Sequence, residues 1–139
     1  MRFELVDAIV EQQPGRIVTV KAVTSAEEYL ADHFPGFPVL PGVMMLEAMV
    51  QAARRILADE YGPGPWVLAE ARNIRYGHMV RPGQQLSVTV EHLKADDPDT
   101  HTFNGRGTVH ESTAVQGRLI MTRRRVGAPA APPHRNGEL

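Results

Sequence analysis

The spacing of apolar residues predicts one long helix in this chain. Between residues 43 and 61 the apolar positions recur at helical spacing, and strong helix-forming residues continue up to Gly62-Pro63. One broad face of the helix is apolar, which predicts that this face is buried against the rest of the fold. Its members are Met45, Leu46, Met49, Ala53, Ile56 and Leu57.

Strand-like runs lie on both sides of this helix. Two precede it and four follow it, with alternation of apolar and polar residues clearest in the second run after the helix, at Leu86, Val88 and Val90. A short helix that opens with a capping box is predicted at residues 25–31. One long helix and about six strands predict an α+β fold in which an antiparallel sheet curls around the helix. The predicted strands are at about residues 2–12, 16–24, 65–76, 84–95, 100–111 and 113–125.

A segment with three prolines leads directly into the long helix. It reads HFPGFPVLPG, residues 33–42, and it forms neither a helix nor a central strand, because each proline lacks a backbone donor. We therefore expect a rigid loop that holds His33 near Gly42 at the helix start. Residues 127–139 carry three further prolines and predict a flexible tail, which leaves residues 1–126 as one domain.

His33, Gly42 and Glu47 form a candidate site. Backbone N–H groups and the positive end of the dipole at a helix start stabilise an oxygen that gains negative charge, and Gly42 permits its close approach. Histidine is the usual proton acceptor near neutral pH. Glu47 lies among apolar neighbours in VMMLEAMV, where a carboxyl group can hold a proton to donate. The three groups suit proton removal next to a carbonyl, followed by elimination.

The same residues allow a simpler interpretation. Glu47, Gln51, Arg54 and Arg55 fall along one stripe of the helix, as on a solvated face. A single histidine in a loop is most often a surface residue.

Composition and charge restrict the chemistry further. The chain contains no cysteine, which excludes disulfides, thiolate zinc sites and a cysteine nucleophile. The net charge of −1 gives no overall basic field for nucleic acid, although residues 72–139 carry ten Lys/Arg against six Asp/Glu. His92, His101 and His110 recur every nine residues without the spacing of a metal site, so no metal is expected.

The N-terminal residues and the apolar runs bear on location. Charged residues interrupt the start of the chain where a signal peptide needs an apolar run. No segment approaches the about 20 apolar residues that cross a membrane. We therefore expect a cytoplasmic protein that does not bind membranes.

Residues 33–53, HFPGFPVLPGVMMLEAMVQAA, closely resemble the signature of the FabZ-type 3-hydroxyacyl-acyl-carrier-protein dehydratases. Residues 71–91, ARNIRYGHMVRPGQQLSVTVE, are similar to the second strand block of that family. The resemblance spans about residues 3–125 and implies the hot-dog fold, a sheet wrapped around a central helix. It also implies dehydration of a (3R)-3-hydroxyacyl thioester on acyl carrier protein to the trans-2-enoyl thioester, in fatty acid or related polyketide biosynthesis.

The resemblance implies a role for each matched residue. His33 and Glu47 match the catalytic pair, and Gly42 matches the backbone N–H donor to the thioester oxygen. Val39 matches the carbonyl that orients the histidine, and Gln51 matches the residue that supports the acid and its water. In the family the catalytic pair comes from different subunits, which implies a homodimer or a trimer of dimers. Neither a metal nor a diffusible cofactor is implied.

The implied partner is acyl carrier protein, which carries the acyl chain on phosphopantetheine. At residues 76–79 the chain lacks the basic pair that receives the carrier protein in the family. The candidates to supply that charge instead are Arg72, Arg75, Arg81 and Arg123 to Arg125.

Glu47 also bears on the reaction outcome, because the isomerising branch of the family has aspartate at this position. The glutamate implies dehydration without a cis-3 product. Two other functions fit the fold: an acyl thioesterase that hydrolyses the thioester, and a non-catalytic partner that binds acyl thioesters. His33, Gly42 and Glu47 argue against the second, since a binding module needs none of them.

Overall fold

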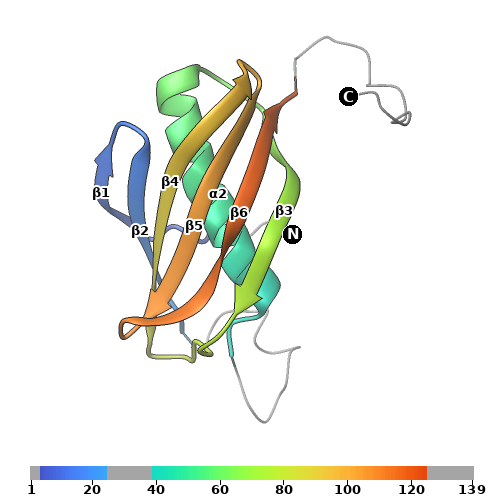
Figure 1. Cartoon of the computed structure of the whole chain (residues 1–139). Coiled ribbons are helices and arrows are strands. Elements are labelled where there is room, and N and C mark those ends of the chain that lie inside the picture. Colours follow the sequence, from blue (N-terminus) through green and yellow to red (C-terminus); the bar gives the residue numbers. More distant parts are fainter. Residues whose placement is uncertain (1–3, 25–38, 125–139) are drawn as a thin grey trace.

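A six-stranded antiparallel sheet curves around one long helix, α2 (Figure 1). The computed structural model describes residues 4–24 and 39–124. The strand order across the sheet is β1-β2-β4-β5-β6-β3, so the strand that follows α2 lies at the edge opposite β1. This arrangement confirms the predicted hot-dog fold. In chain order the elements are β1 Ala8–Gln13, β2 Arg16–Ala22, α2 Gly42–Tyr61, β3 Trp66–Tyr76, β4 Gln85–Asp97, β5 Thr100–Val109 and β6 Ser112–Arg123.

Helix α2 lies where the apolar pattern predicts it. It begins one residue before the predicted start and ends at Tyr61, followed by Gly62 at φ 93°, a backbone angle that favours glycine. The predicted apolar face is buried, except that Leu46 is only half-buried. The buried residues of the helix are Met45, Ala48, Met49, Val50, Ala52, Ala53, Ile56 and Leu57.

The first strand is shorter than predicted. Residues 4–7 precede it, although Leu5 and Val6 are buried. At Asp7 a side-chain oxygen accepts a hydrogen bond from the Ala22 N–H at 2.7 Å, where a continued ladder would use a backbone carbonyl. The side chain of Asp7 therefore ends the ladder that the apolar pattern had extended toward the N-terminus. The predicted helix at 25–31 and the tail at 127–139 lie outside the described residues.

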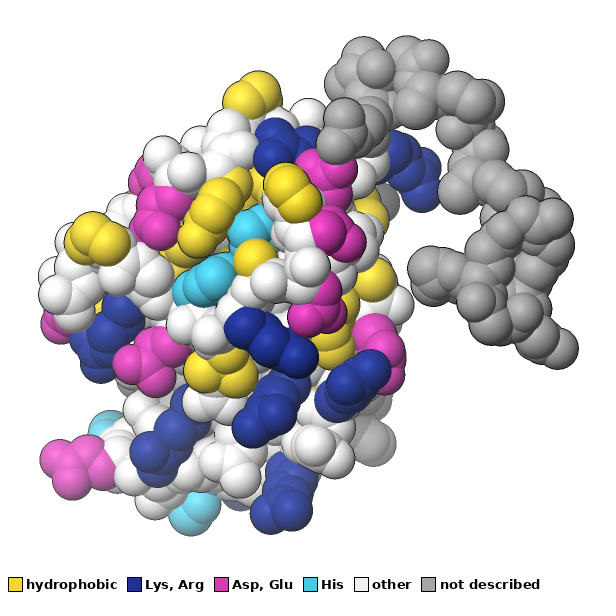
Figure 2. All heavy atoms as spheres, turned by 45° about the horizontal axis from the view of Figure 1, so that its top comes forward, with side chains coloured by type: hydrophobic (Ala, Val, Ile, Leu, Met, Phe, Trp, Pro, Cys, Tyr) yellow, Lys and Arg dark blue, Asp and Glu magenta, His cyan; other side chains and the backbone are white. Residues whose placement is uncertain are grey.

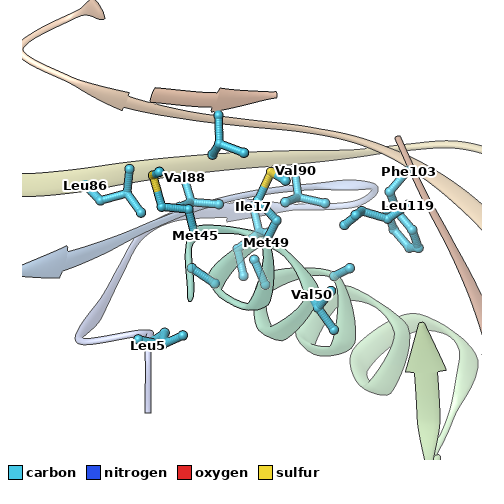
Figure 3. Close-up of a cluster of buried hydrophobic side chains, with 14 of the residues drawn as sticks. Leu5, Ile17, Met45, Met49, Val50, Leu86, Val88, Val90, Phe103 and Leu119 are labelled. Carbon is cyan, nitrogen blue, oxygen red and sulfur yellow. The ribbon is translucent and has the colours of Figure 1, made fainter. Parts of the chain in front are cut away.

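The core fills the space between α2 and the concave face of the sheet. In Figure 3 the side chains of Met45 and Met49 on the helix point toward the sheet, where Val88 and Val90 alternate inward along β4. A Cβ atom added at Gly105 in β5 would lie 2.7 Å from the Met49 sulfur. The glycine thus lets the helix pack closely against the middle of the sheet.

The described part of the chain, residues 4–24 and 39–124, contains no helix with the length and apolar character needed to cross a membrane.

Truncation of a buried helix side chain tests the importance of this packing. Ile56 is fully buried in the core, so Ile56→Ala should lower the free energy of unfolding by about 2–5 kcal/mol, through lost burial and the cavity left behind. Val10→Ala is the matched control, because Val10 is 64% exposed and its truncation should cost no more than about 0.5 kcal/mol. Denaturant unfolding at one fixed protein concentration measures both. Equal losses in the two variants would contradict this assignment of the core.

Candidate active site

Four of the five predicted site residues lie in the described part of the chain. Val39, Gly42, Glu47 and Gln51 belong to the start of α2 and the segment that leads into it. His33 lies outside the described residues, so its distance to the others stays a prediction.

The start of α2 is fixed by the segment after β3. Val39 and Leu40 are buried, and the Leu40 N–H donates to the Val80 carbonyl at 2.7 Å. Pro41 is extended and is followed at once by the helix, whose first turn has neither an acidic residue nor a side-chain cap among the described residues. The positive end of the helix dipole is therefore not neutralised by a carboxylate of this turn. An anionic oxygen would be stabilised here, as the sequence predicts.

Tyr76, at the end of β3, lies directly against Gly42. A Cβ atom added at Gly42 would lie 2.9 Å from the Tyr76 ring, closer than side-chain atoms normally approach. Tyr76 as a residue remains 52% exposed. A side chain at position 42 would therefore require the Tyr76 ring to move. No sequence pattern predicts this contact, because the two residues are far apart in the chain and belong to different elements.

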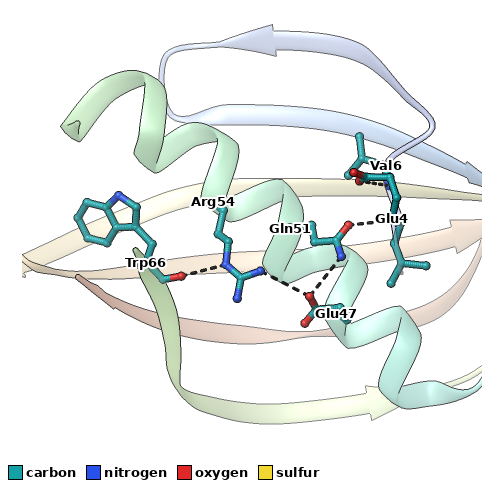
Figure 4. A network of polar contacts seen from close by, with 7 residues as sticks. Glu4, Val6, Glu47, Gln51, Arg54 and Trp66 are labelled. Atoms are coloured by element: carbon teal, nitrogen blue, oxygen red, sulfur yellow. Dashed lines mark hydrogen bonds and ion pairs between the residues drawn. The ribbon is translucent and has the colours of Figure 1, made fainter. Parts of the chain in front are cut away.

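Glu47 lies on a polar stripe of α2 (Figure 4). Its Oε2 accepts a hydrogen bond from Gln51 Nε2 at 3.2 Å and lies 3.5 Å from Arg54 Nη1. Gln51 Oε1 in turn accepts the Leu5 N–H at 2.8 Å. The structure thus brings Glu47 and Gln51 together, as the family resemblance implied.

The expectation that Glu47 has apolar surroundings is wrong, and the alternative, a solvated stripe shared with Gln51 and Arg54, is what the structure shows. In the single chain its side chain is 39% exposed and its two nearest polar neighbours both donate to it. The reason is the helical period: residues 47, 51 and 54 lie on the side of α2 opposite the buried apolar face. The apolar neighbours of Glu47 in the sequence point elsewhere.

The structure also gathers aromatic rings at the C-terminal end of α2. His92 Nε2 lies 3.0 Å from His101 Nδ1, and both imidazoles contact the Tyr61 ring. The other ring nitrogen of His101, Nε2, lies 3.0 Å from the Pro98 carbonyl, which can only accept. His101 Nε2 therefore carries a hydrogen, and Nδ1 is left to accept from His92 Nε2–H.

These contacts make His92 and His101 part of a packed cluster. His110 lies apart from it, in the turn between β5 and β6. Within residues 4–24 and 39–124, no group of three or more His, Asp or Glu side chains is arranged to hold a metal ion. Burial lowers the pKa of His92, the neighbouring His101 lowers it further, and Glu60 opposes the shift.

The fold and the position of the carboxylate define a class of protein: a hot-dog enzyme with an acidic residue on its central helix. The chain matches the family model of ApeI-like dehydratases over residues 10–118. The 3-hydroxyacyl-[acyl-carrier-protein] dehydratase FabZ of Verminephrobacter eiseniae is 36% identical over 135 residues, covering 91% of this chain and 88% of the relative. FabZ of a Polaromonas species is 38% identical over 130 residues, covering 88% of each chain.

A solved structure agrees on the fold. The dehydratase heterocomplex ApeI:P from Xenorhabdus doucetiae superposes with a TM-score of 0.72 at 19% identity, covering 88% of this chain and 84% of that chain. The chain belongs to the FabZ-type family of 3-hydroxyacyl-acyl-carrier-protein dehydratases.

The lowered pKa of His92 gives a pH dependence to stability. The unfolded chain takes up a proton at the ordinary value of 6.5, whereas folded His92 does so only at lower pH. The contribution of His92 to the free energy of unfolding is therefore fully present above pH 6.5. It is lost as the pH falls below this value toward the pKa of His92 in the folded protein. We expect His92→Gln, which keeps a donor for His101 but does not titrate, to flatten this loss.

Denaturant midpoints measured from about pH 7.5 down to about pH 5 check this expectation, since this range spans the titration of the unfolded chain. His78→Gln is the control, because His78 is exposed and lies outside the cluster. If His92→Gln and the unchanged protein lose stability in parallel, His92 does not contribute to the pH dependence.

Proposed function

We propose that this protein dehydrates (3R)-3-hydroxyacyl thioesters on acyl carrier protein to trans-2-enoyl thioesters, in fatty acid or related polyketide biosynthesis. The observation that carries this proposal is the match to FabZ dehydratases over about nine-tenths of the chain, with Glu47 and Gln51 in contact at 3.2 Å. Fold likeness alone would allow a thioesterase equally well.

The reaction needs an acid, a base and a donor to the thioester oxygen. The Gly42 N–H, at the positive end of α2, would donate a hydrogen bond to the thioester oxygen as that oxygen gains negative charge. His33 would remove the proton from the carbon next to the carbonyl, and the Val39 carbonyl would orient its ring. The electron pair of that C–H bond forms the double bond as the C3–O bond breaks. The hydroxyl leaves as water with a proton supplied by Glu47, directly or through a water molecule held with Gln51.

The edge of the sheet supports a homodimer. Strand β3 has 11 residues and, in the described part of the chain, a strand neighbour on one side only. Its last residue, Tyr76, is exposed next to the helix start, and Val43 and Met79 are further exposed apolar residues near this end. Pairing of two copies along this edge would satisfy its backbone groups and cover these side chains. A trimer of dimers and a cytoplasmic location stay predictions.

The outer face of the sheet offers a basic surface for the carrier protein. Figure 2 shows Lys and Arg side chains gathered on the face turned away from α2. Arg75, Arg106 and Arg118 line an open groove of about 480 Å³ there. Arg75 directly precedes Tyr76, so this groove adjoins the strand end that contacts Gly42.

The arginines that the sequence analysis proposed for binding the carrier protein differ in their ion pairs within the chain. Arg72 pairs with Glu70 at 2.6 Å, and Arg123 pairs with Asp99 at 3.1 Å. Arg75 has no ion-pair partner among the described residues and is therefore the better candidate. Arg106 and Arg118 were not proposed from the sequence, because only the sheet pairing places Arg118 of β6 beside β3 and Arg106 of β5 on the far side of β6 from β3. Arg125 lies outside the described residues.

Substitution of the catalytic pair tests the reaction. His33→Ala and Glu47→Gln should each lower turnover of a 3-hydroxyacyl carrier protein by about a hundredfold or more, since acid–base groups contribute on that scale. Size-exclusion chromatography should show an unchanged oligomer. The product should be the trans-2-enoyl chain with no cis-3 isomer. Full activity in both variants would contradict the proposal, and release of free thiol without enoyl product would identify a thioesterase.

Charge reversal tests the carrier surface. The double variant Arg75→Glu with Arg118→Glu should raise KM for the carrier-bound substrate by about tenfold or more, because opposite charges steer such encounters. The same variant should use a pantetheine thioester with nearly unchanged kinetics. Lys94→Glu is the control, since Lys94 is exposed but does not line the groove. An unchanged KM in the double variant would remove the groove from the docking surface.

A further inference from the structure

Arg54 reaches along the polar stripe of α2 toward Glu47. The two residues are seven positions apart, which separates their backbones by about 10 Å along the helix axis. Side chains of a helix lean toward its N-terminus, so Arg54 and Gln51 both extend in the direction of Glu47. Figure 4 shows the side chains of Arg54 and Gln51 both reaching the Glu47 carboxylate, from different directions.

The guanidinium of Arg54 makes two contacts at once. Its Nε donates to the Trp66 carbonyl at 2.9 Å, and its Nη1 lies 3.5 Å from Glu47 Oε2. One arginine thus connects the carboxylate to the first residue of β3. A lysine has all three of its N–H donors on one nitrogen, so it lacks the separate, planar nitrogens with which Arg54 reaches the two groups.

Trp66 is a rigid anchor for this connection. Its side chain is buried, and its indole Nε1 donates to the Gly62 carbonyl at 3.0 Å. The guanidinium of Arg123 lies 4.3 Å from the centre of the ring. The Trp66 backbone is therefore held by the ladder to β6 and by side-chain contacts. The Arg54 guanidinium, which donates a hydrogen bond to the Trp66 carbonyl, is held in place by it.

Both donors meet at the same oxygen of the carboxylate. Gln51 Nε2 and Arg54 Nη1 contact Oε2, whereas Oε1 has no hydrogen-bond partner among the described residues. Gln51 is itself fixed at its other end by the Leu5 N–H. The arrangement restrains one oxygen from two directions and leaves the second oxygen available.

Stability does not explain this arrangement. The side chains of Arg54 and Glu47 are 42% and 39% exposed, and ion pairs with such exposure contribute little to folding. The neighbouring Arg55 is exposed, and no ion pair to it is found among the described residues. The two consecutive arginines thus differ in that only Arg54 contacts the candidate catalytic acid.

We propose that Arg54 is a positioning residue that, with Gln51, holds Glu47 Oε2 against the β3 backbone and presents Oε1 to the substrate. This inference rests on the proposed function, in which Glu47 is the catalytic acid. Arg54 acts only through Glu47 and does not touch the reacting atoms. Loss of Arg54 should therefore affect the chemical step more than substrate binding.

A spectroscopic measurement tests the contact without substrate. In protein with ¹³C-labelled glutamate, the side-chain carboxyl resonance that Glu47→Gln removes identifies Glu47. We expect Arg54→Met to shift this resonance, because it removes a charged donor at Oε2. Arg55→Met is the matched control and should leave it in place. An unmoved resonance in Arg54→Met would overturn the proposal, whatever reaction the enzyme performs.

Kinetics test the consequence of the contact. Arg54→Met should lower kcat by about tenfold to a hundredfold with KM changed by no more than about twofold, as expected for a misplaced catalytic group. The kcat of Arg54→Lys should lie between that of Arg54→Met and that of the unchanged enzyme. Arg55→Met should match the unchanged enzyme, and thermal unfolding should show all three variants folded.

A double variant distinguishes the positioning role of Arg54 from the catalytic role of Glu47. If Arg54 acts through Glu47, Arg54→Met should have almost no further effect on the residual rate of Glu47→Gln. An equal fold-loss in both backgrounds would overturn the positioning role and leave the proposed function intact. Full activity of Glu47→Gln alone would contradict the proposed catalytic role instead, while the carboxyl resonance would still report whether Arg54 holds Glu47.

Discussion

The burial of one face of α2 in the curved sheet is the constraint on which the other features depend. Eight residues of the helix are buried, and five of the six strands contribute to the surface that covers them. This apolar contact fixes the rotation of the helix about its own axis. The close approach at Gly105 and Met49 fixes its height above the sheet. A helix held in this way has only one side left for polar groups.

That remaining side carries the candidate chemistry. Glu47, Gln51 and Arg54 lie on it because the helical period places them opposite the buried face. The contacts that restrain Glu47 then come from both neighbours of the helix: the N-terminal segment at Leu5 and the first residue of β3 at Trp66. The position of the carboxylate is thus determined by core packing on one side of the helix and by polar contacts on the other.

The helix and the strands were predictable because their signals are local. The helical spacing of apolar residues, which ends at Gly62, predicted both ends of α2 to within one residue. The alternation of apolar and polar residues predicted the bounds of β4 closely. The start of β1 was not predicted, since the side chain of Asp7 bonds to the Ala22 backbone in place of a ladder partner. The pairing of His92 with His101 was also missed. Their nine-residue spacing shows no metal motif, and only the antiparallel turn between β4 and β5 brings them together.

The sequence by itself determined the helix, the succession of helix and strands along the chain, and the residues that match the dehydratase family. These properties depend on neighbouring residues, on periodicity and on a contiguous motif. Only the tertiary structure decided that the Tyr76 ring lies against Gly42, that Arg54 joins Glu47 to Trp66, and that arginines of three strands share one groove. Such contacts depend on the sheet register and on the rotation of α2. The sheet register and the rotation of α2 are both set by the packing of residues that are far apart in the chain. A pattern of neighbouring residues does not predict such packing.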